Sequence, residues 1–196
     1  MNQRLLLIAC VTAAVSVQAH AADKKQSAPL RPEQVKVLVQ IKDDSLERFA
    51  SFSTADVKKR KLFSSADAFG FLRAKLDKSN GEAGYHVYTV IEYERDWRFY
   101  ERVNYSLGGD LKTDDLNKIS RDVYSCRAWC SYSEHVSFFL TEEQAKTVAN
   151  MPSGENFRYR LKSRAGVDTD VELEPSEFGG LLAAVEEYRA KLSAPK

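Results

Sequence analysis

The chain has 196 residues, of which 43% are apolar, and its 29 lysines and arginines nearly balance 28 acidic residues. This length and apolar content suffice for the core of one domain, so disulfide bonds are not required for folding. The near-zero net charge argues against a general nucleic-acid-binding protein, because affinity for phosphates depends on a surplus of basic residues.

The first 21 residues have the pattern of a cleavable secretory signal peptide. Arg4 precedes an apolar run from Leu5 to Val17, and small residues at 19 and 21 mark a cleavage site. This run of 13 residues is too short to span a membrane, so we expect a soluble protein of the periplasm. An outer-membrane lipoprotein acylated at Cys10 is the less favoured alternative, because only five apolar residues precede that cysteine.

A flexible leader and a first strand are expected next. Residues 22–34 contain two prolines and no hydrophobic periodicity, which is typical of a linker. Residues 35–41 alternate β-branched and other side chains, which predicts a strand. Residues 64–78 then change to helical spacing, with Phe69 and Leu72 on one face, and predict a helix that covers the sheet.

Two runs rich in aromatic and β-branched residues, 85–94 and 97–106, are expected to pair as a hairpin. The second run places Trp97, Phe99, Val103 and Tyr105 on one face, which we expect to be buried. The other face should be in contact with water. Its residues Arg98 and Tyr100 are therefore candidate binding residues.

The last third of the chain predicts two helices and a second hairpin. Thr141 and Gln144 have the spacing of a capping box at the start of a short helix. Residues 157–163 and 167–173 are expected to pair as the hairpin. Helical spacing over residues 176–192 predicts a C-terminal helix, in which Gly179 and Gly180 allow close packing on the sheet.

Together these elements predict an α+β fold with about seven mainly antiparallel strands and three helices packed on the sheet. We expect one domain over residues 35–194, in which residues 134–194 could form a C-terminal submodule.

Cys126 and Cys130 remain after removal of the signal peptide, and an even number of cysteines in an exported protein predicts a disulfide bond. On one extended strand the two would lie about 13 Å apart, too far for a direct bond, so the chain must reverse between them. A hairpin centred on Ala128 would pair Cys126 with Cys130, Tyr124 with Tyr132, and Asp122 with Glu134. The alternation of side-chain types along this segment is equally consistent with a turn near residues 133–135.

A copper-handling or thiol-redox protein that uses Cys126, Cys130 and His135 is the alternative for this pair, because thiolate and imidazole ligands suit copper. The C-x-x-x-C spacing with a distant histidine is similar to the copper pattern of Sco-type assembly proteins, although no proline follows Cys130. A thioredoxin-type site requires a C-x-x-C motif at the start of a helix, whereas these cysteines lie in a strand-like context.

The sequence contains none of the common catalytic motifs, so we expect a non-enzymatic protein without a cofactor. Its predicted role is exported binding or interaction in the cell envelope, with another envelope protein or a glycan as partner. If the disulfide-closed turn holds Arg127 and Trp129 outward, they join Arg98 and Tyr100 as candidate binding residues. The equal alternative is that Trp129 folds back onto the sheet. A toxin-immunity or enzyme-inhibitor protein is an alternative within the binding class.

Overall fold

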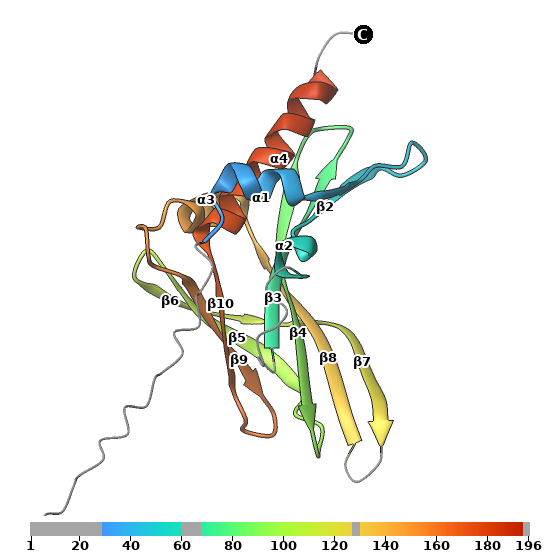
Figure 1. The fold of residues 1–196 in the computed structure, drawn as a ribbon, viewed down its shortest axis with the longest axis vertical. Helices are drawn as coiled ribbons and strands as arrows, with labels where there is room; N and C mark the ends of the chain where they lie inside the picture. Colours follow the sequence, from blue (N-terminus) through green and yellow to red (C-terminus); the bar gives the residue numbers. More distant parts are fainter. Residues whose placement is uncertain (1–28, 60–67, 127–129, 194–196) are drawn as a thin grey trace, which may run out of the picture.

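The computed structural model describes residues 29–59, 68–126 and 130–193, which form two antiparallel sheets and four helices (Figure 1). The α+β class is confirmed, but the sheets contain ten strands rather than about seven, and there is one helix more than expected. No helix in this part of the chain is both long and apolar enough to cross a membrane.

The larger sheet has six strands in the order β1-β2-β3-β4-β8-β7, and the smaller has four in the order β10-β9-β5-β6. The strands of the larger sheet are β1 (Gln40–Lys42), β2 (Phe49–Ser53), β3 (Ala68–Asp77), β4 (Ala83–Glu94), β7 (Asn117–Cys126) and β8 (Cys130–Leu140). Those of the smaller sheet are β5 (Tyr100–Leu107), β6 (Asp110–Asp115), β9 (Phe157–Ser163) and β10 (Thr169–Leu173). The helices are α1 (Pro32–Leu38), α2 (Ala55–Lys59), α3 (Glu142–Ala149) and α4 (Pro175–Ser193).

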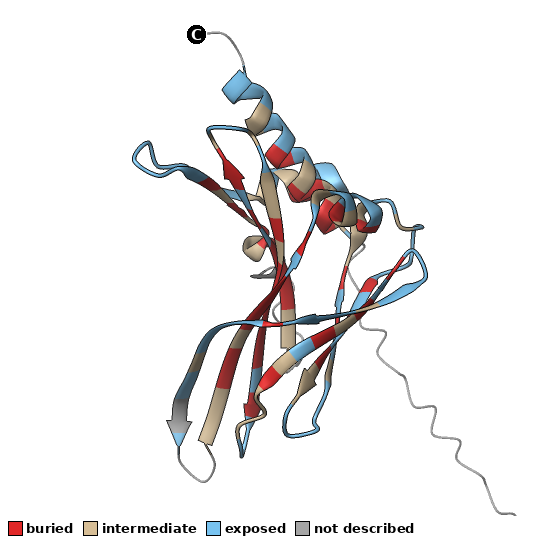
Figure 2. Cartoon of the chain, turned by 180° about the vertical axis from the view of Figure 1, so that it is seen from behind, coloured by how far each residue is buried: buried red, intermediate tan, exposed pale blue. Residues whose placement is uncertain are grey.

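One face of the six-stranded sheet, here called the inner face, is covered over the strands β2, β3, β4 and β8. The helices α3 and α4 lie over one end and the four-stranded sheet over the other (Figures 1 and 2). The rings of Phe138 on β8 and Tyr159 on β9 are 5.3 Å apart, and Phe52 on β2 meets Tyr188 on α4 at 5.5 Å. A single cluster of buried apolar side chains, from Ala50 to Val185, therefore joins both sheets and α4.

Among the described residues, a small second cluster of apolar side chains lies on the opposite, outer face. Phe71, Tyr88 and Val90 are buried there, with Ala55 of α2 packed against them. Most of this face is left uncovered by the four helices and the smaller sheet. It is the face on which a binding surface can be sought.

Several expected elements are confirmed. Thr141 caps α3, and both bonds of the capping box with Gln144 are present. The strands β9 and β10 pair as the predicted hairpin, and α4 covers the predicted span 176–192.

Two expected elements are wrong in type. Residues 32–38, partly within the expected leader and partly within the expected strand, form α1, because Val35 packs fully buried against α4. Residues 68–77, expected as a helix, form strand β3 between β2 and β4. Its inner-face residues Leu72, Ala74 and Leu76 follow the period of two that a strand requires.

The expected hairpin between residues 85–94 and 97–106 is also wrong. β4 pairs with β3 and β8, whereas β5 pairs with β6 and β9 in the other sheet. The short connection between β4 and β5 thus passes from one sheet to the other. Arg95 and Phe99 in this connection have positive φ angles of 87° and 57°, which allow the abrupt change of direction.

Candidate functional site

The cysteine pair closes the end of the β7–β8 hairpin. Cys126 lies opposite Cys130 with their Cα atoms 4.0 Å apart, and the two are joined by a disulfide bond. The other two expected pairs are wrong by one residue, since the register shifts between Val123 and Ser125, and Asp122 therefore faces Ser133. Such a bulge inserts one extra residue on one strand. Arg127 and Trp129 lie outside the described residues.

His135 does not lie with the two cysteines. It is five residues from Cys130 along β8, or about 17 Å in an extended strand. Its Nδ1 atom is instead 3.2 Å from the hydroxyl oxygen of Tyr88. The residues that the structure describes contain no group of three histidine, cysteine or acidic side chains able to hold a metal ion.

Tyr100 is fully buried, so its expected position on the wet face of the strand is wrong. The register of β5 against β9 shifts between Tyr100 and Arg102, and this irregularity turns Tyr100 to the same side as the buried Val103. Its hydroxyl is 2.5 Å from the Thr169 hydroxyl. Arg98 is half-buried and lies over the Tyr93 ring, with 4.5 Å between its guanidinium carbon and the ring centroid.

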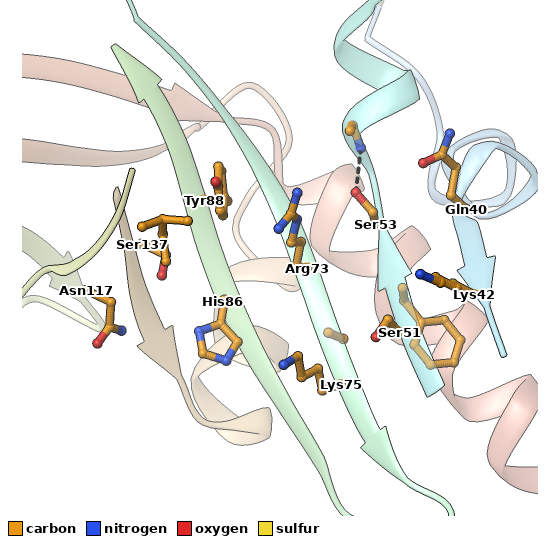
Figure 3. A pocket seen from close by; sticks show the side chains of 14 residues that line it. Gln40, Lys42, Ser51, Ser53, Arg73, Lys75, His86, Tyr88, Asn117 and Ser137 are labelled. Carbon is orange, nitrogen blue, oxygen red and sulfur yellow. Dashed lines mark hydrogen bonds between the residues drawn. The ribbon is translucent and has the colours of Figure 1, made fainter. Parts of the chain in front are cut away.

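The outer face of the six-stranded sheet holds a surface depression, which we call the outer groove (Figure 3). Its volume is about 670 Å³. Its lining combines cationic, hydroxyl, amide and aromatic side chains: Gln40, Lys42, Ser51, Phe52, Ser53, Ala55, Arg73, Ala74, Lys75, His86, Tyr88, Asn117, Ile119 and Ser137.

The strand register arranges these side chains in rows across the sheet. The first row runs through Gln40, Ser53, Arg73, His86 and Phe139, which are successive Cα partners. Because alternate residues of a strand point to the same face, a second row lies two residues away and contains Lys42, Ser51 and Lys75. On its other side, a third row contains Phe71, Tyr88, Ser137 and Asn117.

The groove is positively charged. Arg73, Lys75 and Lys42 are exposed, and none of the fourteen lining residues is acidic. The guanidinium carbon of Arg73 lies 4.2 Å from the centroid of the Tyr88 ring, a cation–π contact that holds the side chain flat over the sheet. The side-chain amide of Gln40 donates to Asp56 of α2 at the margin of the groove.

His86 lies between Arg73 and Phe139 in the first row. Its ring packs edge-on against Phe139 with centroids 5.5 Å apart. Partial burial, together with the nearby charges of Lys75 and Arg73, lowers the pKa of His86 below its usual value. The imidazole is therefore neutral at pH 7 and can both donate and accept a hydrogen bond.

Sequence reasoning missed this groove because its residues come from six strands and form no local motif. The one signal available was the alternation of Phe69, Phe71, Arg73 and Lys75 in residues 68–77, which is visible only if that segment is interpreted as a strand. No protein-family model, no curated protein and no solved structure matches this chain, so the site rests on its geometry alone.

Proposed function

We propose that this chain is an exported, non-enzymatic binding protein of the cell envelope that holds its ligand in the outer groove. The observation that carries the proposal is the contrast between the two faces of one sheet. The inner face is buried under helices and the second sheet, whereas the outer face presents three exposed cations and no lining carboxylate. An open, charged sheet face with convergent polar side chains is typical of a ligand surface.

The positions of the histidines support a binding role rather than catalysis. Within the described ranges, His135 contacts Tyr88 and His86 contacts Phe139, and neither histidine is hydrogen-bonded to a serine or cysteine. Where histidine is the base that activates a serine or cysteine nucleophile, the two side chains lie within hydrogen-bonding distance. In the disulfide between Cys126 and Cys130 neither sulfur is a free thiolate that could bind copper, and the bond is compatible with an oxidising compartment.

Export is tested by mass spectrometry of the protein recovered from its native host. We expect a mature chain that begins at Ala22 in the soluble envelope fraction. An acylated N-terminal Cys10 in the membrane fraction would show instead that the protein is a lipoprotein.

Binding through the groove is tested with immobilised mature protein exposed to an envelope extract. A variant carrying Arg73→Gln and Lys75→Gln removes two groove charges. A matched control, Arg102→Gln with Lys112→Gln, removes two charges from the four-stranded sheet. We expect the wild type and the control to retain a component that the groove variant loses. Equal retention by all three proteins would contradict a role for the groove.

A further inference from the structure

The outer groove crosses the entire width of the six-stranded sheet. Lys42 lies on one edge strand, β1, and Asn117 lies on the other, β7. Five spacings of about 4.8 Å separate these strands, so the groove is about 24 Å long. Since both of its ends reach a sheet edge, a ligand longer than the groove can continue past the protein. This shape suits a polymer better than an enclosed small molecule.

The charges of the groove are spaced for more than one anionic group. Arg73 and Lys75 point to the same face of β3, two residues or about 6.6 Å apart along the strand. Lys42 lies on β1 in the same row as Lys75, with Ser51 between them. A guanidinium and an ammonium at these positions can each form a charge-assisted hydrogen bond with a separate carboxylate.

The neutral side chains favour a ligand rich in hydroxyl groups. Ser51, Ser53, Asn117 and Ser137 together supply hydroxyl and amide groups that both donate and accept hydrogen bonds. An extended peptide would instead present backbone N–H and C=O groups to a sheet face whose own backbone groups are already paired in the strand ladders. Peptides usually bind to sheet edges for this reason.

An exposed aromatic side chain lies at the end of the first row. Phe139 is 48% exposed, next to the His86 ring. A Cβ atom at Gly84 would lie 3.1 Å from the Phe139 ring, so the glycine lets this ring pack close to β4 with its other side exposed. The ring is therefore accessible as an apolar platform for the C–H face of a sugar.

From these features we infer that the groove binds an acidic polysaccharide across the strands. Its carboxylates pair with Arg73 and Lys75 in the groove, while a sugar ring packs on Phe139, which lies just outside the groove lining, next to His86. This inference rests on the proposed function and names the ligand class for the same groove. The inferred binding depends on two properties of the ligand, its negative charge and its sugar hydroxyls, and on one property of the protein, the accessible ring of Phe139.

The experiment measures binding of the mature chain to three polymers by calorimetry. Polygalacturonate carries both carboxylates and sugar hydroxyls, its methyl ester keeps the sugar without the charge, and poly-L-glutamate keeps the charge without the sugar. We expect polygalacturonate to bind at least about tenfold more tightly than either of the others, because each loses one set of contacts. Binding should weaken as salt is raised, since the ion pairs are exposed.

Variants connect this binding to the groove. Arg73→Gln with Lys75→Gln should weaken polygalacturonate binding by at least about tenfold, and Phe139→Ala should weaken it by about fivefold. The control with Arg102→Gln and Lys112→Gln should bind like the wild type. All the substituted side chains are exposed or half-buried, and unchanged melting temperatures will confirm that the variants are folded.

The contrary results separate this inference from the proposed function. If poly-L-glutamate binds as tightly as polygalacturonate, the groove does not recognise sugar hydroxyls and the ligand is not a polysaccharide. If the methyl ester binds as tightly, the groove does not require carboxylates and the ligand is not acidic. Binding that the Arg73 and Lys75 changes leave intact would place the site elsewhere. If no polymer binds while the groove variant still loses its component from the envelope extract, the polysaccharide is wrong and the binding role of the groove remains. Failure of both experiments contradicts both proposals.

Discussion

Glu134 is a fully buried carboxylate on β8 that accepts hydrogen bonds from three other segments. It accepts from the Tyr93 hydroxyl at 2.5 Å, from the Arg121 guanidinium at 3.0 Å, and from the backbone N–H groups of Phe99 and Tyr100 at 2.9 and 3.3 Å. Burial and the hydrogen bond to Glu134 raise the pKa of Tyr93, so its hydroxyl stays protonated and donates to Glu134. One side chain thus fixes the connection that leads from β4 in the larger sheet to β5 in the smaller one.

Replacing Glu134 with glutamine should lower the free energy of unfolding by about 3 kcal/mol, because Arg121 loses its partner and an amide NH₂ group must face N–H donors. Urea denaturation measures this. The matched control is Glu92→Gln on β4, which changes an exposed carboxylate. The role assigned to Glu134 fails if both variants unfold at the same urea concentration.

The disulfide between Cys126 and Cys130 should contribute little to global stability. The loop that it closes spans only five residues, so the loss of chain entropy in the unfolded state corresponds to about 2 kcal/mol at most. A double variant, Cys126→Ser with Cys130→Ser, should therefore remain folded and bind the groove ligand as the wild type does. Thiol titration of the unreduced chain from residue 22 onward, which lacks Cys10, should find no free thiol. A cooperative loss of structure on reduction alone would contradict this expectation.

At the scale of the elements, Gly180 determines how α1 packs on α4. A Cβ atom at this position would lie 2.5 Å from Cγ1 of Val35 and 2.8 Å from the backbone oxygen of Pro32. The glycine therefore permits a close helix-to-helix contact, rather than the helix-to-sheet contact expected from the sequence. Helix propensity alone favours alanine over glycine by about 1 kcal/mol. Propensity therefore predicts that Gly180→Ala stabilises the protein, whereas packing predicts that it destabilises the protein.

Gly180→Ala should accordingly destabilise the protein by about 1–3 kcal/mol, since the added methyl group must displace α1. Thermal and urea unfolding provide the measurement. Gly179→Ala is the matched control, because its nearest neighbour is the Pro32 side chain at 3.2 Å, and it should remain within about 1 kcal/mol of the wild type. A more stable Gly180→Ala variant would show that the two helices do not pack so closely.

Asp77, at the end of β3, anchors the turn into β4 and should make stability depend on pH. Arg48 Nε donates to its carboxylate at 2.7 Å, and Ser79 donates from both its hydroxyl and its backbone N–H. These hydrogen bonds, with that of Arg48 the largest effect, lower the pKa of Asp77 to about 2. Because this folded pKa lies below the usual value of 3.8, the stabilisation is present above about pH 4 and disappears as the pH falls towards 2.

The Asp77→Asn variant should therefore melt below the wild type at pH 6 and approach the melting temperature of the wild type near pH 2. Thermal unfolding across this range tests the pH profile, and Asp110→Asn at the exposed β5–β6 turn is the control. A difference in melting temperature that is the same at pH 2 and pH 6 would be inconsistent with the ionised Arg48–Asp77 pair.

The sequence predicts those elements whose local pattern agrees with their final packing. Thr141 with its capping box and the helix over 176–192 belong to this group. Residues 68–77 were misinterpreted because Phe69 and Phe71 on the outer face are apolar, so the alternation that marks β3 is obscured. Residues 35–38 carry β-branched side chains but form a helix, since contact with α4 outweighs their intrinsic preference.

At the scale of the whole molecule, the outer groove could not be predicted because it depends on strand order. The strands that supply Arg73 and Ser137 are separated by more than fifty residues, and β8 reaches β4 only after the chain has passed through the smaller sheet. Neither hydrophobic periodicity nor turn signals specify such a crossing. By contrast, the disulfide pairing was predictable, because both cysteines lie in one local hairpin.

The passage of the chain through the smaller sheet before it forms β8 argues against an independent submodule over residues 134–194. Strand β8 lies between β4 and β7, and β9 pairs with β5, so both strands would lose partners in an isolated fragment. What remains locally paired is the β9–β10 hairpin with α3 and α4. A two-stranded hairpin has marginal stability by itself, and unpaired strand edges promote aggregation.

We therefore expect the fragment 134–194 to be unfolded or aggregated, whereas the chain from residue 22 onward unfolds in one cooperative transition. The core explains this, since Val136, Phe138 and Leu140 pack in a cluster shared with both sheets and would be exposed in the fragment. Circular dichroism and proton NMR of the two proteins at equal concentration make the comparison. Dispersed amide signals and a cooperative melt from the fragment would show that it folds as an independent unit, and the two sheets would then have to be regarded as separable.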